Sequence, residues 1–203
     1  MQYVIVILLS YILGSSNMAK YLAAIKKVDL TAGGSGNLGA SNAVILMGWG
    51  AGVLTALHDI GKSALAVILA RLVFPDVPYI GAAAGVAAVL GHIFPFWMKF
   101  KGGKGFASYL GMTLALHWKF AIAVLLLVVV VTLITDYIVA ATTTTIVLVP
   151  IGLGILTQSW ILPLILLVAS LVIAWKHREN YVRIYNGTEI GFRKAGRGDY
   201  RVK

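Results

Sequence analysis

Residues 119–157 read KFAIAVLLLVVVVTLITDYIVAATTTTIVLVPIGLGILT, and this stretch decides the fold class. It contains two apolar segments, 119–135 and 138–157, which are separated only by Asp136 and Tyr137. A helix needs about 20 mostly apolar residues to cross the hydrocarbon core of a bilayer. Each segment approaches that length, so the stretch is predicted to form two transmembrane helices joined by a tight turn.

The same apolar pattern recurs along the rest of the chain. Further candidate spans lie at 3–23, 48–72, 79–98, 105–117 and 160–176, of which 48–72 is interrupted by charged residues and 105–117 is short. The composition agrees, since 60% of the 203 residues are hydrophobic and 12% are charged, against about 25% charged residues in soluble domains. We therefore expect an all-α polytopic membrane protein with seven transmembrane helices, which forms a single domain over residues 1–203 and contacts membrane lipids.

The distribution of basic residues predicts the orientation of the chain. The net charge is +10, and many of the 17 lysines and arginines follow Trp175. If seven helices alternate in direction, this basic tail shares one side of the membrane with the loops 24–47 and 99–104, whereas Arg71 and Lys119 fall on the other side. Cytoplasmic loops carry the excess of lysine and arginine. We therefore expect an external N-terminus, a cytoplasmic C-terminus and no nucleic-acid partner.

A glycine-rich segment follows the first span. Residues 33–42 read GGSGNLGASN, and glycine lets backbone N–H groups converge on an anion. Residues 34–39 match the dinucleotide fingerprint G-x-G-x-x-G, but that motif requires a preceding strand, and here a membrane span precedes it. The segment predicts an anion-binding loop, with a flexible connection between helices as the alternative.

A second glycine-rich segment, FKGGKG at residues 100–105, lies just after the span 79–98. Its paired glycines are expected to expose N–H groups to a phosphate, and its lysines supply positive charge. A helix that starts near residue 105 would direct its N-terminus at the same phosphate. Anchoring at the cytoplasmic side explains the lysines but not the glycines, so we predict a phosphate-binding loop.

Two more polar segments adjoin the predicted spans. Residues 142–145 are four threonines, whose hydroxyls in a helix commonly bond back to their own backbone, and we favour that interpretation. His177, Asn180 and Arg183 would share one face of a short helix at the membrane interface, where a headgroup-sized substrate arrives. The latter segment therefore predicts a second part of a binding site.

The remaining charged residues do not indicate a metal site or a hydrolase. Asp59 and Lys62 are spaced to pair with each other inside the bundle. The chain has no cysteine and no cluster of histidines and carboxylates with metal-ligand spacing. The motifs His-x-x-x-x-Asp and Gly-x-Ser-x-Gly are both absent. We expect neither a metal nor a cofactor.

Taken in this order, the motifs resemble those of the bacterial acyl-phosphate:glycerol-3-phosphate acyltransferases. The resemblance rests on residues 34–42, 59–62, 91–95, 100–105, 177–180 and 186–189. It implies an inner-membrane enzyme, with its active site at the cytoplasmic face, that transfers a fatty acyl group from acyl phosphate to the 1-hydroxyl of glycerol 3-phosphate. The products would be lysophosphatidic acid and phosphate, in the first step of phospholipid synthesis.

The resemblance also implies roles for individual residues. Ser35 and His177 are expected to be catalytic. The expected substrate-binding residues are Gly36, Asn37, Ser41, Asn42, Lys101, Gly102, Gly103, Lys104, Thr142 and Asn180. Because acyl phosphate is already activated, the protein mainly has to align two anions and stabilise a developing oxyanion. Either a substrate phosphate or His177 would then take the proton of the attacking hydroxyl.

Two positions depart from the family pattern. Ile45 and Asp136 stand where the family usually has arginines, and a lost charged hydrogen bond costs about 1.5–3 kcal/mol. Either Arg183 or Lys26 replaces the missing charge, or the acceptor differs. The alternatives are therefore the same fold and donor with another acceptor, or a small transporter of a phosphorylated solute.

Overall fold

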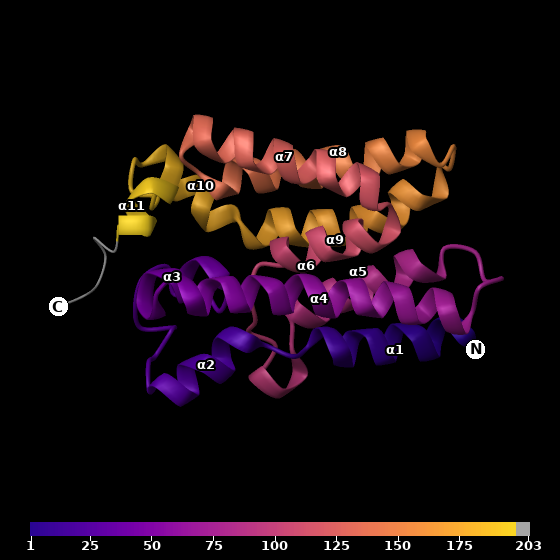
Figure 1. The fold of residues 1–203 in the computed structure, drawn as a ribbon, viewed down its shortest axis with the longest axis horizontal. Helices are drawn as coiled ribbons and strands as arrows, with labels where there is room; N and C mark the ends of the chain where they lie inside the picture. Colours follow the sequence, from indigo (N-terminus) through magenta and orange to yellow (C-terminus); the bar gives the residue numbers. More distant parts are fainter. Residues whose placement is uncertain (198–203) are drawn as a thin grey trace.

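The protein is all-helical over residues 1–197, the part of the chain that the computed structural model describes (Figure 1). The helices are α1 (Gln2–Gly14), α2 (Met18–Lys26), α3 (Ala40–Met47), α4 (Trp49–Val73), α5 (Ile80–Ile93), the 3-10 helix η1 (Phe96–Met98), α6 (Phe106–Leu116), α7 (Trp118–Thr135), α8 (Ile138–Leu156), α9 (Ile161–Lys176), α10 (Arg178–Tyr185) and α11 (Phe192–Arg197). Three charged residues of the expected basic tail, Asp199, Arg201 and Lys203, lie outside the described residues.

The long helices form two packed groups. Helices α1, α4, α5 and α6 pack together in one group, and α7, α8 and α9 form the other. Contacts of α5 with α9 and of α6 with α7 join the two groups. In Figure 1 the N-terminus lies at one end of the bundle, and the short helices α3, α10 and α11 lie at the opposite end.

The core and the surface of the bundle show why the chain requires a membrane. Tyr109, Met112 and Leu166 are fully buried in the core that the two groups share. In contrast, Leu126 and Ile134 of α7 are 63% and 77% exposed, and the exposed faces of the other long helices are apolar as well. A continuous apolar surface of this kind is unfavourable in water and is suited to lipid.

The expected spans are all helical, but 3–23 is divided between α1 and α2, 79–98 between α5 and η1, and the helices differ in length. Within residues 1–197 the segments long and apolar enough to cross a bilayer are Gln2–Lys26, Trp49–Val73, Ile80–Met98, Trp118–Thr135 and Ile138–Leu156. The pair α9 and α10, bent by 45°, is a sixth if it counts as one span. Helix α6 has 11 residues and reaches only about 16 Å into a core about 30 Å thick. The expectation of seven spans is thus confirmed for five or six of them.

The predicted pairing of Asp59 with Lys62 is confirmed. The Nζ atom of Lys62 lies 2.8 Å from Oδ1 of Asp59, and the two residues are 5% and 2% exposed. Their helix, α4, faces α5 and α6 in the interior of the bundle. The two opposite charges therefore compensate each other where neither would be stable alone.

Candidate active site

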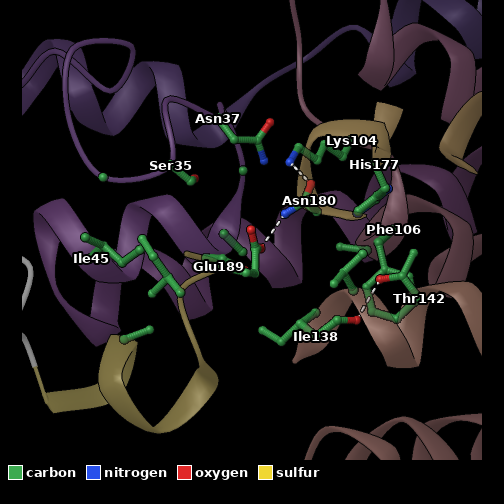
Figure 2. A pocket seen from close by; sticks show the side chains of 18 of the residues that line it. Ser35, Asn37, Ile45, Lys104, Phe106, Ile138, Thr142, His177, Asn180 and Glu189 are labelled. Carbon is green, nitrogen blue, oxygen red and sulfur yellow. Dashed lines mark hydrogen bonds between the residues drawn. The ribbon is translucent and has the colours of Figure 1, made fainter. Parts of the chain in front are cut away.

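A cavity of about 330 Å³ lies at the end of the bundle that is away from the N-terminus. Its lining comes from residues in the ranges 34–45, 104–107, 138–142, 177–183 and 188–195, together with Asp59 and His92. Figure 2 shows Ser35 and Asn37 on one side of this cavity and Lys104, Asn180 and His177 on the other. Three of the motifs that are far apart in the sequence therefore meet at one place.

The glycine-rich loop before α3 is held in shape by Asn42. The side-chain oxygen of Asn42 accepts a hydrogen bond from the backbone N–H of Ser35 at 2.8 Å, and its nitrogen donates to the carbonyl of Leu30 at 2.8 Å. These bonds place Ser35 at the cavity wall, whereas Asn42 is fully buried behind it. Gly36 is also outside the wall and forms a turn with a φ of +66°. Asn42 and Gly36 thus both support the loop in this structure, and the expectation that they bind substrate stays a prediction.

Two helix N-termini face the cavity. Helix α3 begins after Gly39 and helix α6 begins after Gly105, and residues 39–41 and 105–107 all line the cavity. First-turn N–H groups have no acceptor within their own helix, and the helix dipole adds partial positive charge there. Both termini therefore favour a bound anion. The helix predicted to start near residue 105 is confirmed.

The paired glycines of residues 100–105 do not expose their amides. The N–H groups of Gly102 and Gly103 donate to the last carbonyls of α5, at 3.0 and 3.2 Å. Neither glycine lines the cavity, and neither does Lys101. A Cβ atom on Gly102 would lie 2.1 Å from the carbonyl oxygen of His92, so close packing explains the glycine. Lys104 alone of the four lines the cavity, and the expected phosphate contacts of Lys101, Gly102 and Gly103 stay predictions.

Lys104 begins a row of connected polar side chains across the cavity (Figure 2). Its ammonium group donates to the side-chain oxygen of Asn180. The amide nitrogen of Asn180 then donates to Glu189 at 2.5 Å, and Arg183 donates to the other oxygen of Glu189 at 2.6 Å. Burial, and then the neighbouring charge of Arg183, lower the pKa of Lys104 to about 8. The row thus contains two cations and one carboxylate, a net charge of +1 when Lys104 is protonated.

His177 lies directly after α9 and is 6% exposed. Its Nδ1 atom lies 2.8 Å from the carbonyl oxygen of Ile173. Since a carbonyl can only accept, Nδ1 carries the hydrogen and Nε2 keeps its lone pair. Burial lowers the pKa of His177 to about 4, so the side chain is neutral at physiological pH and can accept a hydrogen bond from a hydroxyl.

The four threonines of α8 behave as the sequence suggested. The hydroxyl of Thr142 donates to the carbonyl of Ile138 at 3.0 Å, and Thr143, Thr144 and Thr145 make the same bond one turn back. The interpretation that these hydroxyls bond to their own backbone is confirmed. Thr142 does line the cavity, where its oxygen can still act as an acceptor.

The structure separates the two candidates for the missing charge. Ile45 is 4% exposed and forms part of the cavity wall without contributing charge. Lys26 donates to the carbonyl of Met47 at 3.1 Å and does not line the cavity. Arg183 does line it. Of the two candidates, only Arg183 therefore lies at the cavity in this structure.

The other departure, Asp136, holds the C-terminal segment in place. Its carboxylate accepts from the backbone N–H of Arg193 at 2.9 Å, and its carbonyl accepts from that of Phe192 at 2.7 Å. Phe192 lines the cavity and meets Trp49 edge-on, with ring centroids 6.3 Å apart. Sequence reasoning missed this wall, because no local pattern indicates that residues 190–195 fold back over the cavity.

Residues 1–197 contain no group of three or more histidines and carboxylates that could hold a metal. Comparison with known proteins agrees with the fold and the site described above. A family model described as glycerol-3-phosphate acyltransferase matches residues 4–187. A glycerol-3-phosphate acyltransferase of Coxiella burnetii (strain CbuG_Q212) is 38% identical, over 93% of this chain and 97% of that protein. A glycerol-3-phosphate acyltransferase of Parasynechococcus marenigrum (strain WH8102) is 36% identical, over 89% of this chain and 85% of that protein.

Solved structures give the same result. The crystal structure of PlsY (YgiH), an integral membrane glycerol 3-phosphate acyltransferase, in its glycerol 3-phosphate form, matches with a TM-score of 0.89 and 30% identity over 95% of this chain and 96% of that chain. Its lysophosphatidic acid form matches with a TM-score of 0.86 and 29% identity over 96% and 98%. The chain is therefore a multi-pass membrane protein that belongs to the glycerol-3-phosphate acyltransferase family.

Proposed function

We propose that this protein transfers a fatty acyl group from acyl phosphate to the 1-hydroxyl of glycerol 3-phosphate, releasing lysophosphatidic acid and inorganic phosphate. Family membership supports acyl transfer rather than solute transport. The glycerol 3-phosphate and lysophosphatidic acid forms of PlsY support this acceptor and this product. The acyl-phosphate donor is proposed from the sequence motifs.

One observation carries the proposal, namely the convergence of positive groups on a single cavity. Lys104, Arg183 and the N-termini of α3 and α6 all line it, and Ser35 lies opposite Lys104. Both proposed reactants are phosphorylated, so a site for them must compensate several negative charges. Holding two anions side by side lowers the entropic part of the barrier, and it requires a positive cavity of this kind.

The proposed reaction needs little acid–base chemistry from the protein. The attacking hydroxyl forms a bond to the acyl carbon, the carbon–oxygen bond to phosphate breaks, and first-turn amides stabilise the developing oxyanion. With its pKa of about 4, His177 is a weaker base than a phosphate, whose second pKa is about 6. We therefore propose that a substrate phosphate accepts the hydroxyl proton. Nε2 of His177 accepts a hydrogen bond from the hydroxyl before the reaction and thereby orients it.

The position of the cavity supports a cytoplasmic active site. The end of the bundle that holds the cavity also holds Lys104, Arg183 and Arg193, whereas Arg71 and Lys119 adjoin the ends of α4 and α7 far from it. Cytoplasmic faces carry the excess of basic residues. We therefore propose an inner-membrane protein with an external N-terminus, which acts as one domain over its whole length.

Ile45 favours a second candidate, in which the donor is the same but the acceptor carries less charge. To separate the two, phosphate release by the purified protein with acyl phosphate is followed for glycerol 3-phosphate, another polyol phosphate and glycerol. We expect release with glycerol 3-phosphate. Release with glycerol alone would favour the second candidate, and no release with any acceptor would contradict acyl transfer.

The role of Arg183 is tested by substitution in the same assay. Arg183→Ala is expected to raise KM for glycerol 3-phosphate about 10- to 100-fold, as for the loss of one charged hydrogen bond. Adding Ile45→Arg to that variant places a cation on the part of the cavity wall that α3 contributes and is expected to restore part of the affinity. An unchanged KM in Arg183→Ala would show that this arginine does not replace the missing charge.

A further inference from the structure

A buried polar cluster lies beside the cavity and contains a histidine that the proposed reaction does not use. His92, in the last turn of α5, is 3% exposed, yet it is part of the cavity lining. Its Nδ1 atom lies 2.9 Å from Nζ of Lys62 and 3.2 Å from Oδ1 of Asp59. His58 also approaches Asp59, at 3.5 Å, so the cluster has one carboxylate among several nitrogen groups.

The surroundings of Lys62 determine which ring nitrogen of His92 carries the hydrogen. The ammonium group has three hydrogens to donate and no acceptor. Three atoms surround it at hydrogen-bond distance: the carbonyl oxygen of Ser16 at 2.6 Å, Oδ1 of Asp59 at 2.8 Å and Nδ1 of His92 at 2.9 Å. Each hydrogen has one acceptor only if Nδ1 of His92 keeps its lone pair. The hydrogen of the neutral ring then lies on Nε2.

The opposite tautomer is less favourable. A hydrogen on Nδ1 could be donated to Asp59, but over the longer distance of 3.2 Å. It would point a donor toward the ammonium group of Lys62 and leave one ammonium hydrogen without an acceptor inside the bundle. An unsatisfied buried charged donor costs more than the bond that would be gained.

The Nε2 atom of His92 has no hydrogen-bond partner within residues 1–197. It lies next to Gly103, where an added Cβ atom would come within 2.2 Å of it. Gly103 therefore packs closely against this edge of the ring, and a side chain at position 103 would collide with it. The next residue, Lys104, lines the same cavity as His92. Because His92 lines the cavity, its unpartnered Nε2–H group lies beside a wall that already carries a cation and two helix N-termini.

We propose that His92 is a further substrate-binding residue, whose Nε2–H donates to a phosphoryl oxygen held in the cavity, and that Lys62 and Asp59 are positioning residues that set its tautomer. This role rests on the proposed function, because it assumes a phosphorylated substrate. In this arrangement Lys62 and Asp59 hold the His92 ring so that its Nε2–H group points at the ligand.

Two substitutions of His92 separate the substrate contact from the support. Asn places its side-chain oxygen near the position of Nδ1, so His92→Asn keeps an acceptor for Lys62 and loses the Nε2 donor. Gln places its amide nitrogen near the position of Nε2, so His92→Gln keeps the donor and loses the acceptor. We expect His92→Asn to unfold near the wild-type temperature with kcat/KM reduced about 10- to 100-fold. We expect His92→Gln to unfold at a lower temperature but to keep most of kcat/KM.

The matched control is His117→Asn, at the far end of the bundle, where His117 caps α7 through Phe120 and asparagine caps equally well. It is expected to leave kcat/KM unchanged.

Titrating acyl phosphate and glycerol 3-phosphate separately identifies the bound phosphoryl group, because only the KM of the substrate that is contacted should rise. Wild-type activity in His92→Asn, or losses in both His92 variants that merely follow their stability, would overturn the proposal.

A spectroscopic measurement tests the proposal without relying on variants of His92 or on turnover. The wild-type protein labelled with 15N-histidine has four histidines, whose resonances are assigned by substituting the other three. We expect the hydrogen of His92 on Nε2, and a shift of that resonance when inorganic phosphate is added. A hydrogen on Nδ1, or no response to phosphate in a protein that turns over normally, would contradict the role. Failure of turnover alone would count against the proposed function instead.

Discussion

The depressed pKa of Lys104 makes the activity of this protein dependent on pH in a way that can be calculated. The ammonium group lies among Asn180, Glu189 and Arg183, and burial is the largest cause of its pKa of about 8. Because the lowered pKa belongs to a cation, the charge is present below pH 8 and lost above it. From pH 7 to pH 9 the protonated fraction falls from about nine-tenths to about one-tenth.

If the charge of Lys104 binds an anionic substrate, kcat/KM should fall about tenfold over that interval, since it reports the free enzyme. The assay is phosphate release with subsaturating substrate across pH 6 to 10. Lys104→Arg retains a charge over the whole range, because the guanidinium pKa exceeds about 12. We expect this variant to be less active, since its fork geometry differs, but to lose the alkaline decrease.

Lys104→Ala completes the test. It should lower kcat/KM at pH 7 at least 10- to 100-fold, the cost of about 1.5–3 kcal/mol for a charged hydrogen bond, while the protein still inserts into the membrane. At pH 10 the difference between this variant and the wild type should largely disappear, because the wild-type lysine is then neutral. An alkaline decrease that persists unchanged in Lys104→Arg would refute the reasoning.

Two further predictions concern the C-terminal wall of the cavity and the packing of α6 on α4. Asp136→Ala removes the acceptor for the N–H of Arg193. A side-chain acceptor of this kind at a helix N-terminus is worth about 0.5–2 kcal/mol. The segment that contains Arg193 should therefore open more often, and trypsin should cleave faster at Arg193. Asp136→Asn should resist like the wild type, and equal cleavage of all three proteins would contradict the anchoring role. A Cβ atom at position 111 would lie 2.1 Å from the backbone oxygen of Ile60, so Gly111→Ala should destabilise the bundle by about 1–3 kcal/mol and lower its unfolding temperature in detergent. Gly61→Ala, with no atom within 4 Å of the new Cβ, is the control, and a similar decrease in both variants would contradict close packing at position 111.

Much of the fold was predictable because it depends on local properties. The apolar lengths of 119–135 and 138–157 indicate helices that cross a bilayer, and the turn between them falls at Asp136 and Tyr137, where the structure has it. The threonine hydroxyls bond to carbonyls four residues earlier, which the helix alone determines. The i, i+3 spacing of Asp59 and Lys62 likewise suffices to predict their contact.

The tertiary structure decided the parts of the site that depend on partners distant in the sequence. The free amides expected of Gly102 and Gly103 are occupied by carbonyls of α5, and Asn42 turns inward to support the loop that carries Ser35. Neither outcome is visible locally, because a hydrogen-bonding group takes whichever partner the packing of other helices brings near. The amino-acid sequence alone therefore determined the helices and the residue types of the site, whereas packing decided which of those residues face the cavity.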